Sequence, residues 1–547
     1  MKIDKKSIDI NKIPFSRFGS YFVISVLNNK LWIRDIRGGD NTEGKIFEMS
    51  FSENVTVLMT ETQLNVLGKQ GALHITFINE DTLSFKGNLK VKFKYQLKRY
   101  DTICNLTDDI YELTSYSQEV KIGIKREKGT LKVLDPWDKV GNTKIELCCE
   151  HYYHFFMCSY KTVFTESIIK HRSHGYTFEY WNTLIPNDQT AASYITWMNF
   201  VKPEGQLKRY AMYMSKNWMT NIWSWDNCFS AIFLAHIDSD ISLDQYLMFS
   251  DHQDRSGMYP DFMNDKYVSF SCAKPPIYGW AYEQMCQINP VFKNITLQEK
   301  VYDTISRFTN FWLKHRMSEE GLPYYIHGNE SGWDNGTFYK RGVPMITPDL
   351  ASFLIRQLDF LAKLALDLGL NYESNRLTAE ADRLFDRLMS MLWTDDGFVG
   401  YSLKEKKYID GSNTLQSLLP LIIHYRLSED VKEKLLSILK DESKFLTKYG
   451  LATESIKSSD YQANGYWRGP IWAPVMLLFT SCLEDMGEKE FHKSLVTRFF
   501  NCMKEFGMAE NFDAKKGKGL VDPAFAWTSS VYLHYLFKYD FLKDKKR

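Results

Sequence analysis

The residues whose types best suit chemistry gather in the octet 329–336, which reads Asn-Glu-Ser-Gly-Trp-Asp-Asn-Gly. Gly332 and Gly336 permit the tight backbone that a loop at a site often needs. Trp333 offers a flat apolar face of the kind on which a sugar ring stacks. Beside it, burial could hold a proton on the carboxyl group of Asp334 near neutral pH. A surface turn with an incidental Trp-Asp pair accounts for these residues equally well, so the rest of the chain must decide.

The composition bounds the kind of protein. At 547 residues the chain is too long for one ordinary domain, and two domains are expected. Hydrophobic residues make up 44% and charged residues 25%, which is typical of a soluble globular protein. A formal net charge of only +1 argues against partners such as nucleic acid or an anionic membrane. Aromatic residues reach 15%, a surplus that would serve a core and would also suit a carbohydrate cleft.

Neither a metal nor a cofactor is expected. Nine cysteines are spread along the chain without a CxxC pair, and no histidine cluster completes a zinc pattern near Cys148 and Cys149. They are interpreted as structural thiols in a reducing compartment. No apolar stretch follows residues 1–6, and no segment reaches membrane-spanning length. The sequence therefore predicts a cytoplasmic protein.

Residues 1–160 predict an antiparallel β-sandwich domain. Three segments alternate apolar with polar residues, the period of half-buried strands: 73–77, 83–85 and 89–95. The breaks at 79–81 and 87–88 separate them at hairpin distances. Many short antiparallel strands favour a sandwich. Residues 161–186 are interpreted as a connector between this domain and the next.

From residue 187 to 547 the hydrophobic period is helical. Twelve helices are expected near 188–201, 226–237, 242–251, 276–289, 295–316, 348–368, 372–392, 412–425, 429–440, 471–484, 488–506 and 523–541. The ninth is amphipathic and well charged, whereas the tenth is apolar nearly all round, which implies burial on several faces. Alternating outer and inner helices describe an (α/α)6 barrel, so the chain is expected to be mixed but mainly α. An α-solenoid is the competing arrangement, but no repeat of fixed period supports it.

Unusual residues fall in the loops before the even-numbered, predicted inner helices. Tryptophans, glycines and charged residues gather in these loops at 223–226, 253–260, 274–276, 330–335, 466–472 and 510–519. In a closed barrel these loops share one end, so residues far apart in sequence would meet in one cleft. Purely structural clusters would be scattered over both sets of loops. The one-sided distribution favours a site.

Other chemistries find little support. The sequence has no HExxH, no Walker-type loop and no GxSxG elbow, and the glycines at 517 and 519 do not make a dinucleotide fingerprint. Carboxylates surrounded by tryptophan and tyrosine leave glycoside hydrolysis as the leading chemistry. That reaction needs a protonated acid at the glycosidic oxygen and a second carboxylate across the sugar.

The motifs in these loops resemble those of glycoside hydrolase family 63. The resemblance runs in order across the helical domain and is closest to small bacterial members similar to mannosylglycerate and glucosylglycerate hydrolases. It rests on five stretches, residues 214–226, 253–260, 330–335, 466–472 and 510–517. It implies an (α/α)6 barrel and an exo-acting enzyme that hydrolyses an α-glucosidic or α-mannosidic bond with inversion. The substrate would be a small oligosaccharide or glycosyl conjugate.

The resemblance also assigns roles. The aspartate of Gly-Trp-Asp-Asn, here Asp334, is the expected general acid, and the glutamate of Glu-Asn-Phe-Asp, here Glu510, the expected general base. Glu510 is expected to be ionised, and Glu330 to help orient the loop. The expected sugar-binding residues are Trp223, Trp225, Asp226, Gln253, Trp333, Trp467, Arg468 and Trp527. The chain departs from the family at Gly336, often serine, and at Ala514 and Lys516, in the loop that defines the leaving-group pocket.

Three rivals remain open. A trehalase-like hydrolase uses a similar barrel with similar acid and base motifs. A phosphorylase would place phosphate where the base stands, which a carboxylate at Glu510 argues against. A sugar-binding protein without catalysis would be expected to have lost one of the two carboxylates, and both are present. The sugar, the linkage, the leaving group and the oligomeric state are not encoded in these motifs.

Overall fold

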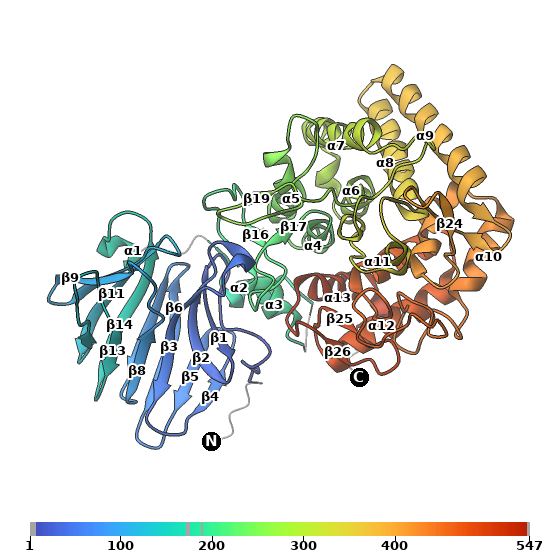
Figure 1. The fold of residues 1–547 in the computed structure, drawn as a ribbon. Helices are drawn as coiled ribbons and strands as arrows, with labels where there is room; N and C mark the ends of the chain where they lie inside the picture. Colours follow the sequence, from blue (N-terminus) through green and yellow to red (C-terminus); the bar gives the residue numbers. More distant parts are fainter. Residues whose placement is uncertain (1–6, 171–174, 187–189, 544–547) are drawn as a thin grey trace. The chain divides into compact units, whose positions relative to one another are not determined.

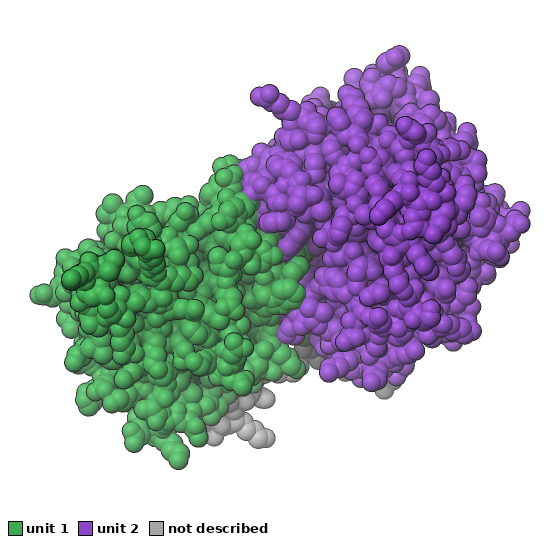
Figure 2. All heavy atoms as spheres, in the orientation of Figure 1, with its two compact units in different colours: residues 1–221, 264–267 green, residues 222–263, 268–547 purple. Residues whose placement is uncertain are grey.

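The described chain forms two compact units. The computed structural model describes residues 7–170, 175–186 and 190–543. Unit 1 comprises residues 1–221 with 264–267, and unit 2 comprises residues 222–263 with 268–547 (Figure 2).

Some predictions fall outside the described residues. These are the chain start at 1–6, part of the expected connector at 171–174, and positions 188 and 189 of the first expected helix. The expected division of the chain at 160 and 187 remains a prediction.

Two antiparallel sheets make up most of unit 1 (Figure 1). The six-stranded sheet has the order β1 (Phe22–Leu27), β2 (Lys30–Asp35), β3 (Lys45–Phe51), β8 (Val91–Tyr95), β13 (Glu146–Cys149), β12 (Lys132–Leu134). The eight-stranded sheet has the order β4 (Thr56–Met59), β5 (Gln63–Leu67), β6 (Ala72–Asn79), β7 (Thr82–Gly87), β14 (Tyr153–Tyr160), β11 (Val120–Gly129), β10 (Ile110–Ser115), β9 (Thr102–Thr107). The predicted N-terminal β region is therefore confirmed.

Aromatic side chains join the two sheets. Phe85 on β7 stacks on Phe155 of β14 with ring centroids 4.9 Å apart. Phe93 on β8, in the other sheet, meets both rings edge-on at 5.4 and 5.6 Å. Residues of β8 alternate between buried and exposed, which is the period that the sequence shows there.

The expected hairpin across 87–88 is wrong. β6 and β7 do pair as a hairpin, but β8 pairs with β3 and β13 in the other sheet. Gly87 lies against the backbone of Ala72, where a Cβ on Gly87 would come within 2.1 Å of the Ala72 carbonyl oxygen. The Asn88 side chain then accepts a hydrogen bond from Ala72 N at 3.0 Å. These contacts end β7 locally, and the chain passes to the opposite sheet instead of turning back.

A buried lysine ties the remaining part of unit 1 together. This part holds α1 (Glu166–Lys170), α2 (Phe178–Thr183), α3 (Ala192–Met198) and the paired strands β15 (Phe200–Val201) and β16 (Ala211–Met212). Lys216 is fully buried, and its Nζ donates to Ser16 Oγ and to the carbonyls of Arg17, Ser20 and Phe200 at 2.6–3.2 Å. Since these acceptors come from two distant stretches, the ammonium group holds the N-terminal segment to the segment around residue 200.

Unit 2 is helical, as predicted. Its helices are α4 (Asp226–Leu234), α5 (Ser239–Leu247), α6 (Tyr278–Ile288), α7 (Ile295–His315), α8 (Pro348–Asp367), α9 (Asn371–Leu392), α10 (Glu429–Leu439), α11 (Ala473–Asp485), α12 (Lys489–Phe506) and α13 (Ala526–Lys538). The stretch expected as a helix at 412–425 is a 3-10 helix, η6 (Leu415–Arg426), with Pro420 inside it and non-helical torsions at Ile423. Proline lacks the N–H that an α-helix needs at that position. None of the helices among the described residues is both long and apolar enough to cross a membrane.

The buried helical elements contact one another in a closed ring. Every residue of α4 is buried, and so are nearly all of α11 and α13, whereas α7, α9 and α12 bury one stripe only. Packing runs from α4 to α6, α8, η6, α11 and α13, and α13 packs back against α4 (Figure 1). Apolar side chains all round a helix require neighbours on several sides, which this ring provides.

Candidate active site

The octet lies between α7 and α8, where the 3-10 turn η4 (Gly328–Ser331) leads into Gly332. Gly332 has φ 74°, and a Cβ there would come within 2.3 Å of Trp225 Cζ2. The indole of Trp225 therefore lies directly on the backbone of the octet, and only glycine fits beneath it. Trp333 is fully buried, whereas the side chain of Asp334 is partly exposed. In the octet, the carboxyl group of Asp334 therefore lies next to the buried indole rings of Trp225 and Trp333.

Glu330 anchors this loop. It is fully buried, and its carboxylate accepts from both terminal nitrogens of Arg316 at 2.7 and 3.0 Å. It also accepts from the backbone N–H of Ile326 at 2.7 Å and of Ala273 at 3.3 Å. With four donors on its two oxygens, this carboxylate is engaged in holding the loop.

Asn335 joins the octet to the loop 465–472. Its Nδ2 donates to the Gly465 carbonyl at 3.0 Å, and its Oδ1 accepts from the Trp467 N–H at 2.9 Å. The Trp467 ring lies 5.2 Å from that of Trp333 and stacks on Trp472 at 3.8 Å with an interplanar angle of 5°. The two loops therefore share one aromatic wall.

The same loop continues to the second carboxylate. Ile471 and Phe512 exchange two backbone hydrogen bonds of 2.8 and 3.0 Å, so the loop pairs with β25 (Asn511–Phe512). Glu510 comes directly before this strand, and its carbonyl accepts from Trp527 Nε1 at 3.1 Å. Trp527 in turn meets Trp472 edge-on at 5.3 Å. An unbroken set of contacts thus runs from Asp334 to Glu510 although the two are far apart in sequence.

Glu510 is fully buried and poorly satisfied. Neither of its carboxylate oxygens has a partner in hydrogen-bond geometry among the described residues. The hydroxyl of Tyr466 is nevertheless close enough to act on this carboxyl group. A buried carboxylate without donors is costly in a purely structural role, so a ligand or water is the natural partner.

Asp226 begins α4 and is only 6% exposed. The residue before it, Trp225, has φ 70°, and Tyr466 has φ 62°. Non-glycine residues rarely adopt this left-handed region, and such strained residues tend to cluster at functional sites. Here both flank the carboxyl groups of the site.

Burial dominates the electrostatics of the three carboxyl groups. It raises the pKa of Asp226 and of Glu510 to about 8 each, and it raises the pKa of Asp334 as well. The charge of Asp334 adds to the rise of the pKa at both other groups. Glu510 was expected to be ionised, but burial, with the charge of Asp522, raises its pKa to about 8 although the Tyr466 hydroxyl lowers it, so its protonated form is favoured below about pH 8.

Three further residues belong to this cluster and were not assigned from the sequence. Lys274 is 7% exposed and donates from Nζ to the Asn329 carbonyl at 2.5 Å. Its ammonium lies 3.5 Å from Asp261 Oδ1. Burial raises the pKa of Tyr466, and Glu510 adds to the rise, so this hydroxyl faces the same carboxyl group. In the sequence, the only indication of a role for Lys274 and Tyr466 is their place in loops where tryptophan, glycine and charged residues gather.

The other predicted sugar-binding residues lie less centrally. The side-chain amide of Gln253 donates to the Gly257 carbonyl at 2.7 Å and to the Thr304 carbonyl at 3.0 Å, and it accepts from the Thr304 hydroxyl. Gln253 therefore joins its own loop to α7. Trp223, in β17 (Ile222–Trp223), packs its partly exposed ring on Phe262 at 5.8 Å.

Arg468 lies in the loop that joins the two carboxylates. Its Nε is buried, with no hydrogen-bond partner among the described residues. Its charge lowers the pKa of the neighbouring Glu454, which burial raises to about 7. This guanidinium therefore retains donor capacity close to the cluster.

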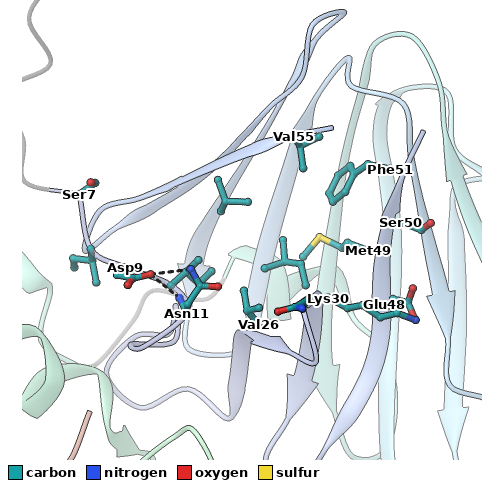
Figure 3. A pocket seen from close by; sticks show the side chains of 15 residues that line it. Ser7, Asp9, Asn11, Val26, Lys30, Glu48, Met49, Ser50, Phe51 and Val55 are labelled. Carbon is teal, nitrogen blue, oxygen red and sulfur yellow. Dashed lines mark hydrogen bonds and ion pairs between the residues drawn. The ribbon is translucent and has the colours of Figure 1, made fainter. Parts of the chain in front are cut away.

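A separate hollow of about 660 Å³ lies in unit 1, lined by strands β1–β4 and the N-terminal segment (Figure 3). Its lining mixes apolar side chains with the ion pair Lys30–Glu48 at 2.9 Å and with Asp9, whose carboxylate holds Asn11. Its described lining residues include no cluster of buried titratable groups comparable to that of unit 2. Within the part of the chain that the structure describes, no group of three or more His, Cys, Asp or Glu side chains is arranged to hold a metal ion.

Part of the chain matches a known protein family. The model of a family described as "Mannosylglycerate hydrolase MGH1-like glycoside hydrolase domain" matches residues 219–528, more than half of the chain. A mannosylglycerate hydrolase MGH1 of Selaginella moellendorffii is 28% identical over 90 residues, 16% of this chain and 18% of that protein. A protein of Schizosaccharomyces pombe described as a probable mannosyl-oligosaccharide glucosidase is 25% identical over 236 residues, 38% of this chain and 28% of that protein. The chain thus spans less than a third of these relatives.

Solved structures show the same fold. The mannosylglycerate hydrolase of Thermus thermophilus in complex with glucose has a TM-score of 0.55 and 18% identity, and the match covers 63% of this chain and 98% of that one. A bacterial glucoamylase in complex with acarbose has a TM-score of 0.61 and 10% identity, and the match covers 97% of this chain and 95% of that one. The second match extends over both units.

Proposed function

The chain belongs to the mannosylglycerate hydrolase MGH1-like group of glycoside hydrolase family 63, and on this premise we propose that it is an inverting, exo-acting α-glycosidase. Its substrate would be a small oligosaccharide or glycosyl conjugate with a terminal α-glucosyl or α-mannosyl residue. The observation that carries the proposal is the fully buried Glu510, without hydrogen-bond donors on its oxygens among the described residues, tied through one loop to the partly exposed Asp334.

In the proposed reaction Asp334 gives its proton to the glycosidic oxygen as the bond from that oxygen to the anomeric carbon breaks. A water on the opposite face forms the new bond to that carbon and passes its proton to Glu510. Exchange with solvent then returns the proton to Asp334 and removes it from Glu510. Inversion requires room for the water, with the two carboxyl groups about 6.5–9.5 Å apart.

The ionisation of Glu510 follows from substrate binding. With its oxygens unsatisfied, burial raises its pKa to about 8. A water that donates to one of these oxygens supplies the hydrogen bond that favours the charged form. The base would therefore be generated when the nucleophile arrives, while the Tyr466 hydroxyl favours the same ionised form.

The remaining site residues would hold the sugar. Asp226 and Arg468 can bind hydroxyl groups, since each offers a polar group at the cluster. The indoles of Trp225, Trp333 and Trp467, which are 0–2% exposed, would support the sugar site from beneath, with Trp527 behind the base. Trp223 and Gln253 are kept in the proposal as residues at the edge of the sugar site.

The closed ring of buried elements supports an (α/α)6 barrel for unit 2. In such a barrel the loops before α4, α6, α8, α11 and α13 share one end, where the cluster stands. All nine cysteines carry free thiols, which suits the proposed cytoplasmic location.

Hydrolysis of a panel of substrates tests the proposal. The panel should contain mannosylglycerate, glucosylglycerate, trehalose and α-linked glucosyl and mannosyl disaccharides, with the anomer first released recorded by NMR. We expect phosphate-independent release of the β-anomer from one class of α-glycoside. First release of the α-anomer would overturn inversion. Turnover of trehalose alone would assign a trehalase, and absence of turnover throughout would favour a sugar-binding protein.

A further inference from the structure

A buried carboxylate fixes the octet at its beginning. Glu330 accepts two hydrogen bonds from the guanidinium of Arg316 and two more from backbone N–H groups. Asp334 follows four residues later, after the left-handed Gly332. The chain beyond Asp334 must therefore be held by other contacts if this carboxyl group is to keep one position.

A second buried carboxylate holds the chain just after Asp334. Thr337 begins the 3-10 helix η5 (Thr337–Arg341), and its hydroxyl donates to Glu454 Oε2 at 2.5 Å. Glu454 is fully buried, and its other oxygen accepts from Ser458 Oγ at 2.5 Å. Hydrogen bonds from hydroxyl groups to a carboxylate are short and about twice as strong as those between neutral groups. One buried carboxylate therefore fixes the loop on each side of Asp334.

The segment that carries Glu454 is itself firmly held. Thr453 Oγ1 donates to the carbonyl of Pro470 and accepts from the N–H of the residue before that proline, and both bonds are 3.0 Å long. The backbone of Glu454 pairs with that of Thr414, at the start of η6. Glu454 therefore stands on a segment that is bonded both to the loop 465–472 and to η6.

The hydrogen bonds also favour the form of Glu454 that accepts them. Burial raises the pKa of Glu454 to about 7, and the charge of Asp460 adds to the rise, whereas the hydroxyls of Ser458 and Thr337 and the charge of Arg468 lower it. Hydrogen bonds donated to a carboxyl group stabilise its ionised form. The two hydroxyls therefore keep Glu454 as an acceptor for Thr337.

We propose that Glu454 and Thr337 form a positioning pair for the proton donor Asp334. The inference rests on the proposed function, because it concerns the same proton transfer. A general acid must lie within hydrogen-bond distance of the oxygen that it protonates. Asn335 ties the octet to the loop 465–472, and the bond from Thr337 to Glu454 is a second, independent contact just after Asp334. Without it, Asp334 would lose its fixed place at the glycosidic oxygen, which lowers the rate more than the binding of substrate.

The test compares the steady-state kinetics of Thr337→Val, Thr337→Ser and Ser412→Ala on the best substrate of the panel. Valine keeps the shape of threonine without its hydroxyl, so we expect kcat to fall by about 10-fold, as for the loss of one hydrogen bond to a charged group, with little change in KM. Thr337→Ser keeps the hydroxyl and should retain the wild-type kcat. Ser412→Ala is the matched control, since it removes a bond of the same kind, 2.8 Å from the exposed Ser412 to Asp410, and should leave kcat unchanged.

A double-mutant cycle shows whether the two residues act together. Glu454→Ala removes the acceptor and should lower kcat at least as much as Thr337→Val does. In the double variant Thr337→Val should add nothing to the loss, because the bond is already absent, and additive losses would overturn the inference. Glu454→Gln should restore most of kcat, since its amide oxygen still accepts from Thr337. If Glu454→Ala does not fold, a lower melting temperature with unchanged kcat in Thr337→Val is enough to reject the inference, because it shows a purely structural contact.

The leaving group distinguishes an effect on Asp334 from a general loss of activity. With an α-glycosyl fluoride, whose leaving group needs little protonation, Thr337→Val should lose little activity. An equal loss on the fluoride and on the natural glycoside would mean that the bond does not act through Asp334, and the inference would fail. If Asp334→Asn abolishes turnover of the natural glycoside while Thr337→Val keeps its kcat, the proposed function stands and this inference fails. If Asp334→Asn retains full turnover, the proposed function itself fails.

Discussion

Asn335 and Trp467 are joined by a hydrogen bond of 2.9 Å, which the backbone N–H of Trp467 donates to the side-chain oxygen of Asn335 across 132 residues of sequence. The same amide donates to the Gly465 carbonyl, so one side chain fixes the loop that leads to Glu510. Asn335→Ala should lower kcat by about 10²-fold, because small displacements of reacting groups are costly. Steady-state kinetics measures this loss of kcat, and thermal unfolding measures any loss of stability separately.

Asn464, exposed in the same loop, provides the matched control for this link. Asn464→Ala should retain wild-type kcat. Equal losses in both variants would show that general loosening of the loop, and not the amide of Asn335, determines the activity.

The two proposed proton-transfer groups should differ in their response to the leaving group. Asp334→Asn and Glu510→Gln should each lower kcat/KM on a natural α-glycoside by about 10³-fold, within the usual range for general acid-base catalysis. On an α-glycosyl fluoride Asp334→Asn should recover most of its activity, whereas Glu510→Gln should not, because attack by water still needs a base. Recovery of Glu510→Gln instead would reverse the assignment of acid and base.

Substitution of Gly332 by any other residue should be destabilising because its Cβ would collide with Trp225, in addition to the strain of a positive φ. Gly332 and Gly369 have nearly the same φ, 74° and 76°, but a Cβ at Gly369 would meet nothing within 4 Å. Gly369→Ala should cost about 1 kcal/mol of backbone strain. Gly332→Ala should cost more and also lower activity, since it displaces Trp225. Chemical denaturation of both variants, with activity assays, makes the comparison; equal destabilisation would remove the Trp225 contact as the cause.

A pair of neighbouring histidines, His534 buried and His236 half-buried, should make stability depend on pH. His236 Nε2 lies 3.1 Å from His534 Nδ1, and burial lowers the pKa of His236 to about 4 and that of His534 well below its usual value. In the unfolded chain both groups bind protons below about pH 6.5. Between about pH 6.5 and 4 the unfolded state therefore binds more protons, and stability must fall as the pH falls through this window.

Thermal unfolding from about pH 7.5 to 4 measures this loss. His534→Phe should flatten the dependence of the melting temperature on pH, whereas His315→Gln, an exposed histidine at the end of α7, should leave the slope unchanged. An unaltered slope in His534→Phe would attribute the loss to carboxyl groups.

Regular periodicity in the sequence was enough to predict most of the elements. The alternation along β8 and the apolar stripe of α9, with Leu377, Leu384 and Leu388 buried, are local patterns that survive in the structure. The exchange of sheets after Gly87 was missed because it depends on a close approach to Ala72, which is a tertiary contact. Likewise, the sequence 415–426 is apolar enough for a helix, but Pro420 changes its hydrogen bonding.

Members of the candidate site could be proposed from the sequence where motifs carry them, and could not where only tertiary contacts do. Asp334 and Glu510 stand in recognisable loops, and hydrogen bonds and ring contacts join these loops in the structure. Lys274 reaches Asn329 across 55 residues, and its partner Asp261 lies in no motif. Burial of Glu510 could not be predicted from its neighbours in sequence, so its raised pKa was not anticipated either. The ionisation of each group in a buried cluster depends on the positions and charges of all the other groups.

The parallel stack of Trp467 and Trp472 also has an optical consequence. Two indole rings 3.8 Å apart with an interplanar angle of 5° are close enough for their electronic transitions to couple, which gives a signal in circular dichroism that neither ring gives alone. Because both rings lie on the loop 465–472, which contacts Asn335 on one side and Phe512 on the other, the coupled signal reports whether this loop keeps its conformation. It does so without any substrate, even in variants that have lost all turnover.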